Sequence, residues 1–483
     1  MRAGERHLAT AVRLNDDGEG IAYIDGLTVF VPGLLPGEQA WVEVTQVARR
    51  YGRARLVSAP EPVPTTAARQ DAAEGAQYEG RRGPAAATVA TDGNGYAMAD
   101  TGRVLPKCAV FGACGGCQLQ HLAYPRQLEH KRRVVEAALR RIGRLADVPV
   151  APVLGMDNPW RYRNQIQVPL RWTDPPGRLT AGFFAMGSHE LVPTEACHLA
   201  SAAMEQTVRA VVRVLADALG PAAADVHHLI VRESYTTGEQ MVVLVAARQD
   251  LDLRQVVDDL LALPRVVSVC RTVQPYRTGP VWGPTVEVLG GKAALTERIE
   301  GLEFLISPRS FFQVNTAQAR VLYAQVVQAA ALQPTDVVLD AYCGTGTIAL
   351  VLARQARKVV GVEQVPAAVA DARRNAAHNG IAHAVFLTGA VERILPRLCT
   401  QEHFDVVVLD PPRKGCAPQV LAAVVAARPR RIIYVSCNPA TLARDLRVLA
   451  DGGFVVRRVQ PVDMFPQTSH IECCALLDLS GAS

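Results

Sequence analysis

The sequence predicts an α/β protein whose C-terminal part forms a doubly wound parallel sheet, with a mixed α/β domain before it and a small β-barrel at the N-terminus. From Ala317 onward, helical segments alternate with short apolar runs, namely DVVLDAY, KVVGVE, AVFLTG, FDVVVLD and RIIYVSC. This alternation is typical of a Rossmann-like sheet covered by helices on both faces. Ligands bind such sheets at the carboxyl ends of the strands, so we expect the functional residues there.

Residues 1–60 predict a small, OB-like β-barrel. In the segment GIAYIDGLTVFVPGLLPGEQAWVEV, β-branched and aromatic residues alternate with Gly and Pro turn signals. A basic run closes the segment, formed by Arg49, Arg50, Arg53 and Arg55. Such a run is either a solvated strand edge or a contact for a polyanion.

The rest of the chain before the parallel sheet divides into two parts. Residues 61–106 are rich in Ala, Gly, Pro, Thr and Asp without periodicity, which predicts a flexible insertion. The central domain is assigned to residues 107–306 and the parallel-sheet domain to residues 307–483. Within the central domain, His228–Arg248 reads as a hairpin that turns at Thr237–Gly238.

A basic amphipathic helix is predicted over residues 126–143, RQLEHKRRVVEAALRRIG. Leu128, Val135, Leu139 and Ile142 recur at helical spacing and would form its buried face. Most of its charged residues would then lie on the solvent-exposed face.

Composition limits the class of protein. The hydrophobic fraction of 49% predicts a globular chain, while the formal net charge of +5 permits a polyanionic partner without requiring one. The first residues contain no apolar signal segment, and no run is long enough to span a bilayer. We therefore expect a soluble, cytoplasmic protein without membrane contact and without an obligate protein partner. The odd number of cysteines, 11, argues against a disulfide framework and favours metal ligation or catalysis.

A glycine loop follows the first strand of the parallel sheet, in the run Asp340–Gly346. Glycines at this place allow the backbone to approach a ligand at a helix N-terminus. Glu363 ends the next strand, where folds of this kind hydrogen-bond a ribose. The pattern indicates a nucleotide-type ligand, and a dinucleotide would fit it equally well.

The fourth strand ends in Asp410-Pro411-Pro412-Arg413-Lys414-Gly415. A carboxylate followed by rigid prolines stands where a methyltransferase of this fold holds its acceptor base, although a Pro-Pro turn after a buried strand has a similar sequence. An aromatic residue after the prolines would favour methylation of an exocyclic amino group. Arg413 follows instead, so the reaction needs a nucleophile from elsewhere.

Cys437 supplies that nucleophile in our interpretation. It lies between a strand and a helix, where Asn438 can act as N-cap and Pro439 suits the first helical position. The positive end of the helix dipole would favour the thiolate. A buried, inert cysteine is the alternative interpretation.

Uracil chemistry explains the need for a thiolate. C5 of uracil is a poor nucleophile until a thiolate adds to C6, after which C5 can attack a methyl sulfonium and must then lose its proton to a base. His470 and Glu472 lie two residues apart at the start of the final strand, which predicts that they share one face. A polar strand edge would have the same sequence.

Clustered cysteines form a second constellation, Cys108-x5-Cys114-Gly115-Gly116-Cys117, and Cys197 could supply a fourth thiolate. Four thiolates hold either zinc or an iron-sulfur cube. Three close cysteines with one distant partner favour the cube, and zinc is the next candidate. The remaining cysteines apart from Cys437 read as core or incidental residues: Cys270, Cys343, Cys399, Cys416, Cys473 and Cys474.

Together these segments resemble the RNA uracil-5-methyltransferase family, which uses S-adenosylmethionine to make 5-methyluridine. The segments SPRSFFQVN, DAYCGTG, DPPRKG, VSCNP and TSHIE follow one another in the family's order. The resemblance implies a class I methyltransferase domain over residues 307–483 and a TRAM domain, a small RNA-binding barrel, over residues 1–60.

The resemblance also implies roles for single residues. Cys437 would be the nucleophile and Glu472 the base that removes the C5 proton. The residues that would contact S-adenosylmethionine are Gln313, Tyr342, Glu363 and Asp410, and Arg413 would lie near the target loop. The subgroup that acts on 23S ribosomal RNA carries a 4Fe-4S cluster on the pattern of Cys108, Cys114, Cys117 and Cys197, whereas the transfer RNA subgroup lacks it.

The sequence therefore predicts an RNA 5-methyluridine methyltransferase acting on 23S ribosomal RNA. Methylation of a transfer RNA uridine is one alternative. An amino-group methyltransferase of the same fold is another, but it would have no use for Cys437 or Glu472. A non-catalytic RNA-binding protein with a structural metal is the alternative from a different class.

Overall fold

The computed structural model describes residues 1–63, 101–173, 175 and 177–481. The chain divides into two compact units, residues 1–134 with 467–469 and residues 135–466 with 470–483. Most of the predicted insertion, residues 61–106, lies outside the described residues. At its near end Glu61–Pro62 forms a short strand, and at its far end Arg103 Nε donates a hydrogen bond of 2.6 Å to Glu38 Oε1.

The N-terminal unit is built on one antiparallel-rich sheet of the order β1-β5-β6-β4-β3-β2, with β7 paired to β5. Alternate residues of these strands point into a core of small and β-branched side chains that includes Ala22, Val29, Val31 and Val42. The period of two in the sequence thus produces the buried face. Its strands are β1 (Arg6–Thr10), β2 (Arg13–Leu14), β3 (Gly20–Ile24), β4 (Leu27–Val31), β5 (Glu38–Val47), β6 (Tyr51–Leu56) and β7 (Glu61–Pro62).

The predicted basic helix is present but changes its winding. It runs as α2 (Tyr124–Ala138) and continues as a π-helical turn, η1 (Leu139–Gly143). Val135 and Leu139 are buried as predicted, whereas Ile142 is 48% exposed. The wider turn shifts the following side chains around the helix axis, so the prediction of a buried Ile142 is wrong.

The central domain forms a sheet of the order β10-β9-β8-β11-β12-β13-β14, in which β12 and β13 are parallel and the other pairs antiparallel. The predicted hairpin is confirmed, since Glu233 pairs with Gln240 across the turn at Thr237–Gly238. Helices α3 (Ala202–Leu219) and α4 (Arg254–Leu261) pack on one face. The strands are β8 (Gln165–Thr173), β9 (Arg178–Phe184), β10 (Leu191–Pro193), β11 (Val226–Glu233), β12 (Gln240–Ala246), β13 (Val266–Val273) and β14 (Val286–Gly291).

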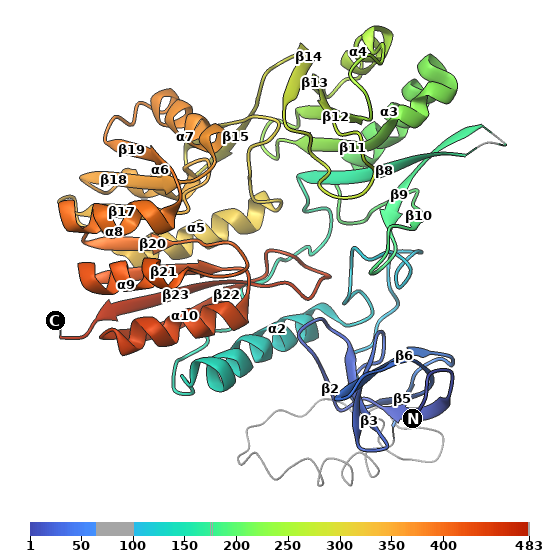
Figure 1. Ribbon diagram of the computed structural model, residues 1–483, viewed down its shortest axis with the longest axis horizontal. Coiled ribbons are helices and arrows are strands. Elements are labelled where there is room, and N and C mark those ends of the chain that lie inside the picture. Colours follow the sequence, from blue (N-terminus) through green and yellow to red (C-terminus); the bar gives the residue numbers. More distant parts are fainter. Residues whose placement is uncertain (64–100, 174, 176, 482–483) are drawn as a thin grey trace. The chain divides into compact units, whose positions relative to one another are not determined.

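The C-terminal domain is the predicted doubly wound sheet, with the order β19-β18-β17-β20-β21-β23-β22 (Figure 1). The first five strands of this order are parallel, and β23 runs antiparallel to both of its neighbours. The strands are β17 (Val337–Ala341), β18 (Lys358–Glu363), β19 (Ala384–Thr388), β20 (Val406–Leu409), β21 (Arg431–Ser436), β22 (Phe454–Val462) and β23 (Glu472–Leu479).

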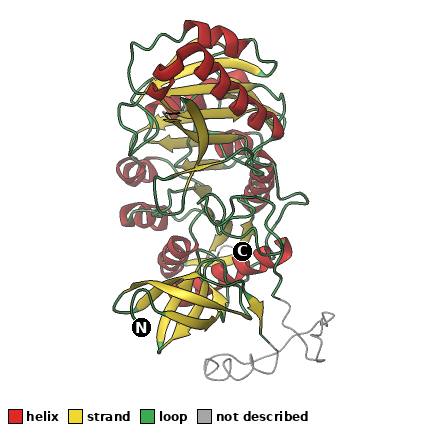
Figure 2. Ribbon diagram, turned by 90° about the vertical axis from the view of Figure 1, so that its right-hand side faces the viewer, coloured by secondary structure: helices red, strands yellow, loops and turns green. Residues whose placement is uncertain are grey.

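Helices cover both faces of this sheet, as Figure 2 shows with helices in red and strands in yellow. The first face packs on α5 (Thr316–Ala330), α6 (Thr347–Ala353) and α7 (Pro366–His378). The second face packs on α8 (Val391–Gln401), α9 (Pro418–Ala427) and α10 (Pro439–Asp451). Successive strand residues such as Val337 and Val338 enter opposite cores, which explains the continuous apolar runs in the sequence.

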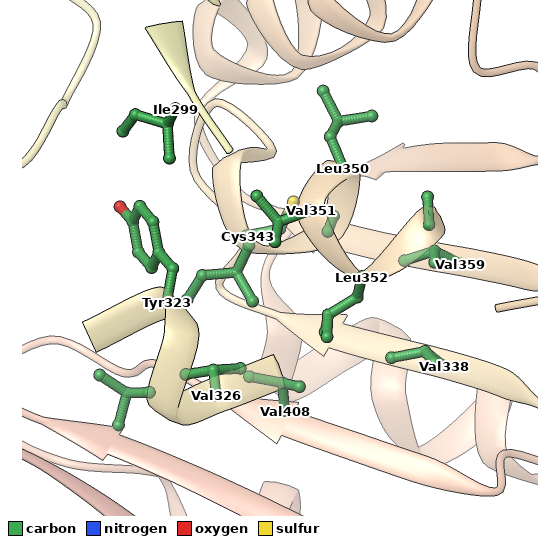
Figure 3. Packing of buried hydrophobic residues seen from close by; sticks show 14 of the residues in the cluster. Ile299, Tyr323, Val326, Val338, Cys343, Leu350, Val351, Leu352, Val359 and Val408 are labelled. Atoms are coloured by element: carbon green, nitrogen blue, oxygen red, sulfur yellow. The ribbon is translucent and has the colours of Figure 1, made fainter. Parts of the chain in front are cut away.

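The first core also receives the hairpin β15 (Leu295–Ile299) and β16 (Leu302–Ile306). In Figure 3, Val338 and Val408 of the sheet lie with Leu352 of α6, and Cys343 lies in the same cluster. Cys343 is therefore a core residue, as predicted. Cys270, Cys416, Cys473 and Cys474 are likewise buried, and Cys399 is partly buried. No helix in the described part of the chain is both long and apolar enough to cross a membrane.

Candidate active site

Four of the predicted site residues lie at the carboxyl ends of four neighbouring strands. Glu363 ends β18, and Tyr342, Asp410 and Cys437 directly follow β17, β20 and β21. The order β18-β17-β20-β21 makes these strands consecutive in the sheet. Because the strands are parallel, these side chains share one edge of the sheet.

The glycine loop fixes the position of the Glu363 carboxylate. Gly344 N donates a hydrogen bond of 3.2 Å to Glu363 Oε2, and Val365 N donates one of 2.8 Å to Oε1. Gly346 begins α6 with φ of 80°, and a Cβ atom there would lie 3.0 Å from the Ala372 and Phe386 side chains. Both the backbone angle and the space require glycine at this residue.

Two carboxyl groups lie beside this loop, those of the half-buried Asp410 and the buried Asp340. Burial raises the pKa of Asp410 to about 7. Asp340 is fully buried, and within the described residues neither of its carboxylate oxygens has a hydrogen-bond partner. Burial, and then the nearby Asp410 carboxylate, raise the pKa of Asp340 well above its usual range. Both carboxyl groups therefore hold their protons more tightly than usual in the free protein.

Cys437 has the predicted backbone setting. Asn438 is the N-cap of α10, and its Oδ1 accepts hydrogen bonds from Ala440 N at 3.0 Å and Thr441 N at 3.4 Å. Pro439 occupies the first helical turn. The thiol therefore lies at the start of a capped helix.

The ionisation of Cys437 differs from the prediction. Burial, and then the carboxylates of Glu472 and Asp410, raise the pKa of the Cys437 thiol to about 11, although Arg413 acts in the opposite direction. A backbone N–H at the helix start also lowers the pKa of Cys437, as expected, but desolvation and the two carboxylates outweigh this contribution in the free protein. The thiol is thus protonated at neutral pH.

Strand register brings Glu472 to Cys437. Ser436 of β21 pairs with Cys473 of β23. Because the two strands are antiparallel, the next residues beyond this pair are Cys437 and Glu472. Glu472 is 5% exposed, and burial followed by the Asp410 carboxylate raises its pKa well above the usual range. A thiol and a buried carboxyl group therefore meet at one point at the edge of the sheet.

His470 does not share the face of Glu472. It precedes β23 and is exposed, whereas Glu472 is buried. His470 Nδ1 lies 3.0 Å from Arg413 Nη2. The predicted common face is wrong because the chain becomes a strand only at Glu472, so the period of two does not extend back to His470.

The loop that carries Arg413 is tied to the helix that carries Cys437. Asn438 Nδ2 and Thr441 Oγ1 donate hydrogen bonds of 3.1 and 3.2 Å to Arg413 O. Arg444 Nη2 donates one of 3.1 Å to Lys414 O. The start of α10 therefore positions both the thiol and the Arg413 loop.

Gln313 lies on a separate loop between β16 and α5. It is 8% exposed, and its backbone oxygen accepts a hydrogen bond of 2.8 Å from Asn164 Nδ2. Phe311 on the same loop is 67% exposed. Sequence reasoning did not single out Phe311, because two adjacent phenylalanines are typical of a hydrophobic core. It also missed the buried carboxyl of Asp340, since an Asp within a strand gives no sign of its hydrogen-bond partners.

The clustered cysteines lie in a turn-rich loop of the N-terminal unit. Cys114 N donates a hydrogen bond of 2.9 Å to Val110 O, and Gly116 N approaches Cys114 Sγ at 3.4 Å. Nearby in sequence, both ring nitrogens of the buried His121 have no hydrogen-bond partner within the described residues. The described residues include no group of three or more His, Cys, Asp or Glu side chains arranged to hold a metal ion.

Comparisons with known proteins agree with this geometry. Residues 298–480 match the family described as tRNA (uracil-5-)-methyltransferase, and residues 4–57 match the TRAM domain. An uncharacterized RNA methyltransferase of Listeria monocytogenes is 39% identical over 477 residues, which cover 97% of this chain and 96% of the relative. One of Halalkalibacterium halodurans is 40% identical over 478 residues, with 97% and 96% covered.

The chain belongs to the RNA uracil-5-methyltransferase family. A solved structure agrees, the Pyrococcus abyssi tRNA (uracil-54, C5)-methyltransferase in complex with S-adenosyl-L-homocysteine, with 25% identity and a TM-score of 0.70 over 98% of this chain and 100% of that one. The protein is thus an RNA methyltransferase that uses S-adenosylmethionine. The predicted class I methyltransferase fold and the N-terminal TRAM domain are both confirmed.

Proposed function

We propose that this RNA methyltransferase transfers a methyl group to C5 of a uridine in 23S ribosomal RNA through a covalent bond between Cys437 and C6 of the base. The observation that carries the proposal is the register of β21 and β23, which sets Cys437 against Glu472 at the carboxyl edge of the sheet. Methylation of an amino group needs neither residue.

The reaction balances with these two groups. Cys437 Sγ forms a bond to C6, and the electron pair of the C5–C6 double bond moves toward O4. C5 then accepts the methyl group, the bond between that methyl and the donor sulfur breaks, and S-adenosylhomocysteine leaves. Glu472 takes the C5 proton, the C5–C6 double bond forms again, and the bond from Sγ to C6 breaks.

Because the pKa values of Cys437 and Glu472 are raised in the free protein, we propose that the bound substrates help both groups to ionise. The Cys437 thiol must lose its proton to solvent before attack, while Glu472 must be ionised so that it can accept the C5 proton, which it releases to solvent after the product leaves. S-adenosylmethionine supplies the methyl group and a positive sulfonium. A positive charge near buried carboxyl groups stabilises their ionised form and so lowers the pKa of Glu472 and Asp410. Gln313, Tyr342, Glu363 and Asp410 are the residues we propose to hold it.

The choice of 23S ribosomal RNA rests on the cysteine pattern. We propose that Cys108, Cys114, Cys117 and Cys197 hold a 4Fe-4S cluster, as in the subgroup that the sequence resembles. Methyl transfer moves no net electrons, so we assign the cluster a structural or RNA-docking role. Iron and acid-labile sulfide in anaerobically purified protein would support the assignment, and stoichiometric zinc without sulfide would contradict it.

A transfer RNA uridine is the second candidate substrate. The matching family is described by its transfer RNA enzymes, and the Pyrococcus abyssi protein acts on uracil-54 of transfer RNA. A direct comparison of the two kinds of RNA is therefore part of the test.

Adduct trapping tests both the mechanism and the substrate. The protein is incubated with S-adenosylmethionine and with 5-fluorouridine-containing 23S ribosomal RNA fragments or transfer RNA, then separated on a denaturing gel. Because fluorine at C5 cannot leave as a proton, we expect a stalled protein–RNA adduct with the ribosomal fragment. Cys437→Ala should abolish the adduct, and Cys399→Ala should not, although burial raises the pKa of this half-buried thiol to about 11 as well.

Each other outcome would support a different function. An adduct with transfer RNA alone would identify a transfer RNA uridine as the substrate. Methylation of normal RNA without an adduct would exclude the thiolate route and favour amino methylation. Neither methylation nor an adduct with either RNA would favour a non-catalytic RNA-binding protein.

A further inference from the structure

A buried arginine of the central domain reaches into the methyltransferase domain. Arg232 on β11 is 6% exposed. Its Nε donates a hydrogen bond of 2.6 Å to Gln165 Oε1 of the neighbouring strand β8. Its Nη1 donates bonds of 2.7 and 3.1 Å to the backbone oxygens of Ser307 and Pro308, and its Nη2 donates one to Ser310 O. A buried cation is costly unless it is fully hydrogen-bonded, and most of these bonds serve one turn of the chain.

The opposite side of the same turn is held by the methyltransferase domain. Asp371 on α7 accepts a hydrogen bond of 2.7 Å from Ser307 Oγ and a further one from Ser310 Oγ. The guanidinium of Arg232 thus binds the carbonyls of the turn, and the carboxylate of Asp371 binds its hydroxyls. We name residues 307–310, held between these two charges, the clamped turn.

The charges of Arg232 and Asp371 favour this arrangement, in addition to the geometry. Burial lowers the pKa of Arg232 to about 10, and the Asp371 carboxylate acts in the opposite direction. A pKa of about 10 leaves the guanidinium charged at neutral pH. The clamped turn therefore lies between the guanidinium of Arg232 on β11 and the carboxylate of Asp371 on α7, which is also ion-paired with Arg374.

The clamped turn leads directly into the cofactor edge of the sheet. Phe311 follows it, and Phe311 O accepts a hydrogen bond of 3.4 Å from Thr345 Oγ1 in the glycine loop. Gln313 follows two residues later, with its backbone oxygen bound by Asn164 of the central domain. The path of residues 307–313 is thus determined from both domains, and it ends on an exposed aromatic ring and a proposed cofactor contact.

We infer that Arg232 is a positioning residue for methyl transfer, which sets the path of residues 307–313 so that Phe311 and Gln313 meet the RNA base and the cofactor. The inference rests on the proposed function, because it gives these residues their ligands. It makes the central domain a structural part of the active site. A displacement of about 1 Å at a reacting group can lower a rate by about 100-fold. A small shift of the clamped turn would therefore slow methyl transfer strongly.

Arg232→Met tests the inference, with Arg271→Met as its matched control. Arg271 on β13 of the same sheet also binds a backbone oxygen, with its Nη1 2.7 Å from Gln249 O, and its Nη2 lies 2.7 Å from Glu287 Oε2. It holds no part of residues 307–313. Single-turnover methylation at saturating RNA and S-adenosylmethionine, the affinity for S-adenosylhomocysteine and the melting temperature are measured for both variants.

We expect Arg232→Met to lower the single-turnover rate by about 100-fold and to weaken S-adenosylhomocysteine binding, while Arg271→Met loses comparable stability and keeps both. Methylguanidine at millimolar concentration should restore part of the rate of Arg232→Met only. Equal rates in the two folded variants would mean that Arg232 only stabilises the fold, and the inference would be wrong.

A second variant serves if Arg232→Met does not fold. Asp371→Asn weakens the clamp from the opposite side and keeps the shape of the side chain. We expect it to slow single-turnover methylation by at least 10-fold at a temperature where it is fully folded; a normal rate would overturn the inference. An inactive wild-type protein would contradict the proposed function instead, so the two failures are distinguishable.

Discussion

At the scale of single residues, the active edge of the sheet combines buried acids with a thiol that is not ionised. A carboxyl group whose pKa is raised by burial lowers the stability of the fold once it loses its proton. Asp410, with its pKa raised to about 7, is such a group. The free protein therefore carries an electrostatic cost that a positive ligand can relieve.

This cost predicts an unusual response to substitution of Asp410. The folded-state pKa lies above the usual 3.8, so the stabilising contribution is fully present below that value and is lost as the pH rises through about 7. At pH 8 we expect Asp410→Asn to raise the melting temperature of the free protein by about 5 °C while it weakens S-adenosylmethionine binding. Thermal melts at pH 5 and pH 8 measure the effect, which should be clearly smaller at pH 5, because the folded carboxyl is then protonated.

Asp451→Asn is the control for this prediction. Hydrogen bonds from Arg447 lower the pKa of Asp451, so its charge is favourable and its loss should not stabilise the protein. Equal shifts for the two variants at pH 8 would show that the Asp410 effect does not arise from burial.

The reactivity of Cys437 gives a second prediction at this scale. Its thiol has a pKa of about 11, which Arg413 lowers. Only the thiolate reacts with iodoacetamide, so the alkylation rate should rise about tenfold per pH unit between pH 7 and pH 9. Arg413→Met should slow alkylation several-fold at pH 8.5 by raising that pKa, whereas Lys414→Met, a neighbouring exposed charge, should not. Mass spectrometry of Cys437 peptides checks this, and equal rates in both variants would contradict it.

At the scale of elements, the start of α10 combines two tasks in one side chain. Asn438 caps the helix and also holds Arg413 O, so the thiol and the Arg413 loop depend on the same residue. Ser201 caps α3 in the ordinary way, accepting a hydrogen bond of 3.0 Å from Met204 N. Both residues are helix N-caps, but Ser201 donates its second hydrogen bond to Glu233, away from the Arg413 loop.

Asn438→Ala and Ser201→Ala should therefore separate stability from activity. Each loses an N-cap, which costs about 1 kcal/mol in the free energy of unfolding. Asn438→Ala should in addition lower the methylation rate by at least 10-fold, because the Arg413 loop loses a hydrogen bond. Urea unfolding and initial rates measure the two effects. A similar rate in both variants would mean that Asn438 acts only as a cap.

Sequence patterns predicted the elements better than their environments. The strand runs, the N-cap at Asn438 and the hairpin at Thr237–Gly238 are local, so composition and spacing suffice to find them. The exposed Ile142 was missed, because spacing cannot reveal a π-helical turn. The pKa of Cys437 was missed, because it depends on Glu472 and Asp410, which only the folded sheet brings near.

At the scale of the whole molecule, the TRAM domain divides its basic run into arginines with and without an ion pair among the described residues. Arg53 Nη1 pairs with Glu19 Oε1 at 2.6 Å, and Arg55 Nη2 pairs with Glu43 Oε1 at 2.7 Å. Their charge is therefore partly compensated within the domain. Arg49 and Arg50 lie exposed between β5 and β6, and the described residues give them no ion pair. A phosphate would meet these two side chains without breaking an existing pair.

RNA affinity of the whole enzyme should reflect this difference. We expect a double variant of Arg49→Ala and Arg50→Ala to bind substrate RNA more weakly and to lower the slope of log affinity against log salt by about 1.4, because each lost contact to single-stranded phosphate contributes about 0.7. Arg55→Ala should change the slope less, since Glu43 already neutralises that charge. Fluorescence anisotropy over a salt series measures both, and methylation at saturating RNA should stay normal because the sheet edge is untouched. If Arg55→Ala had the larger effect, RNA would have to displace Glu43, and the paired face of the barrel would be the binding surface.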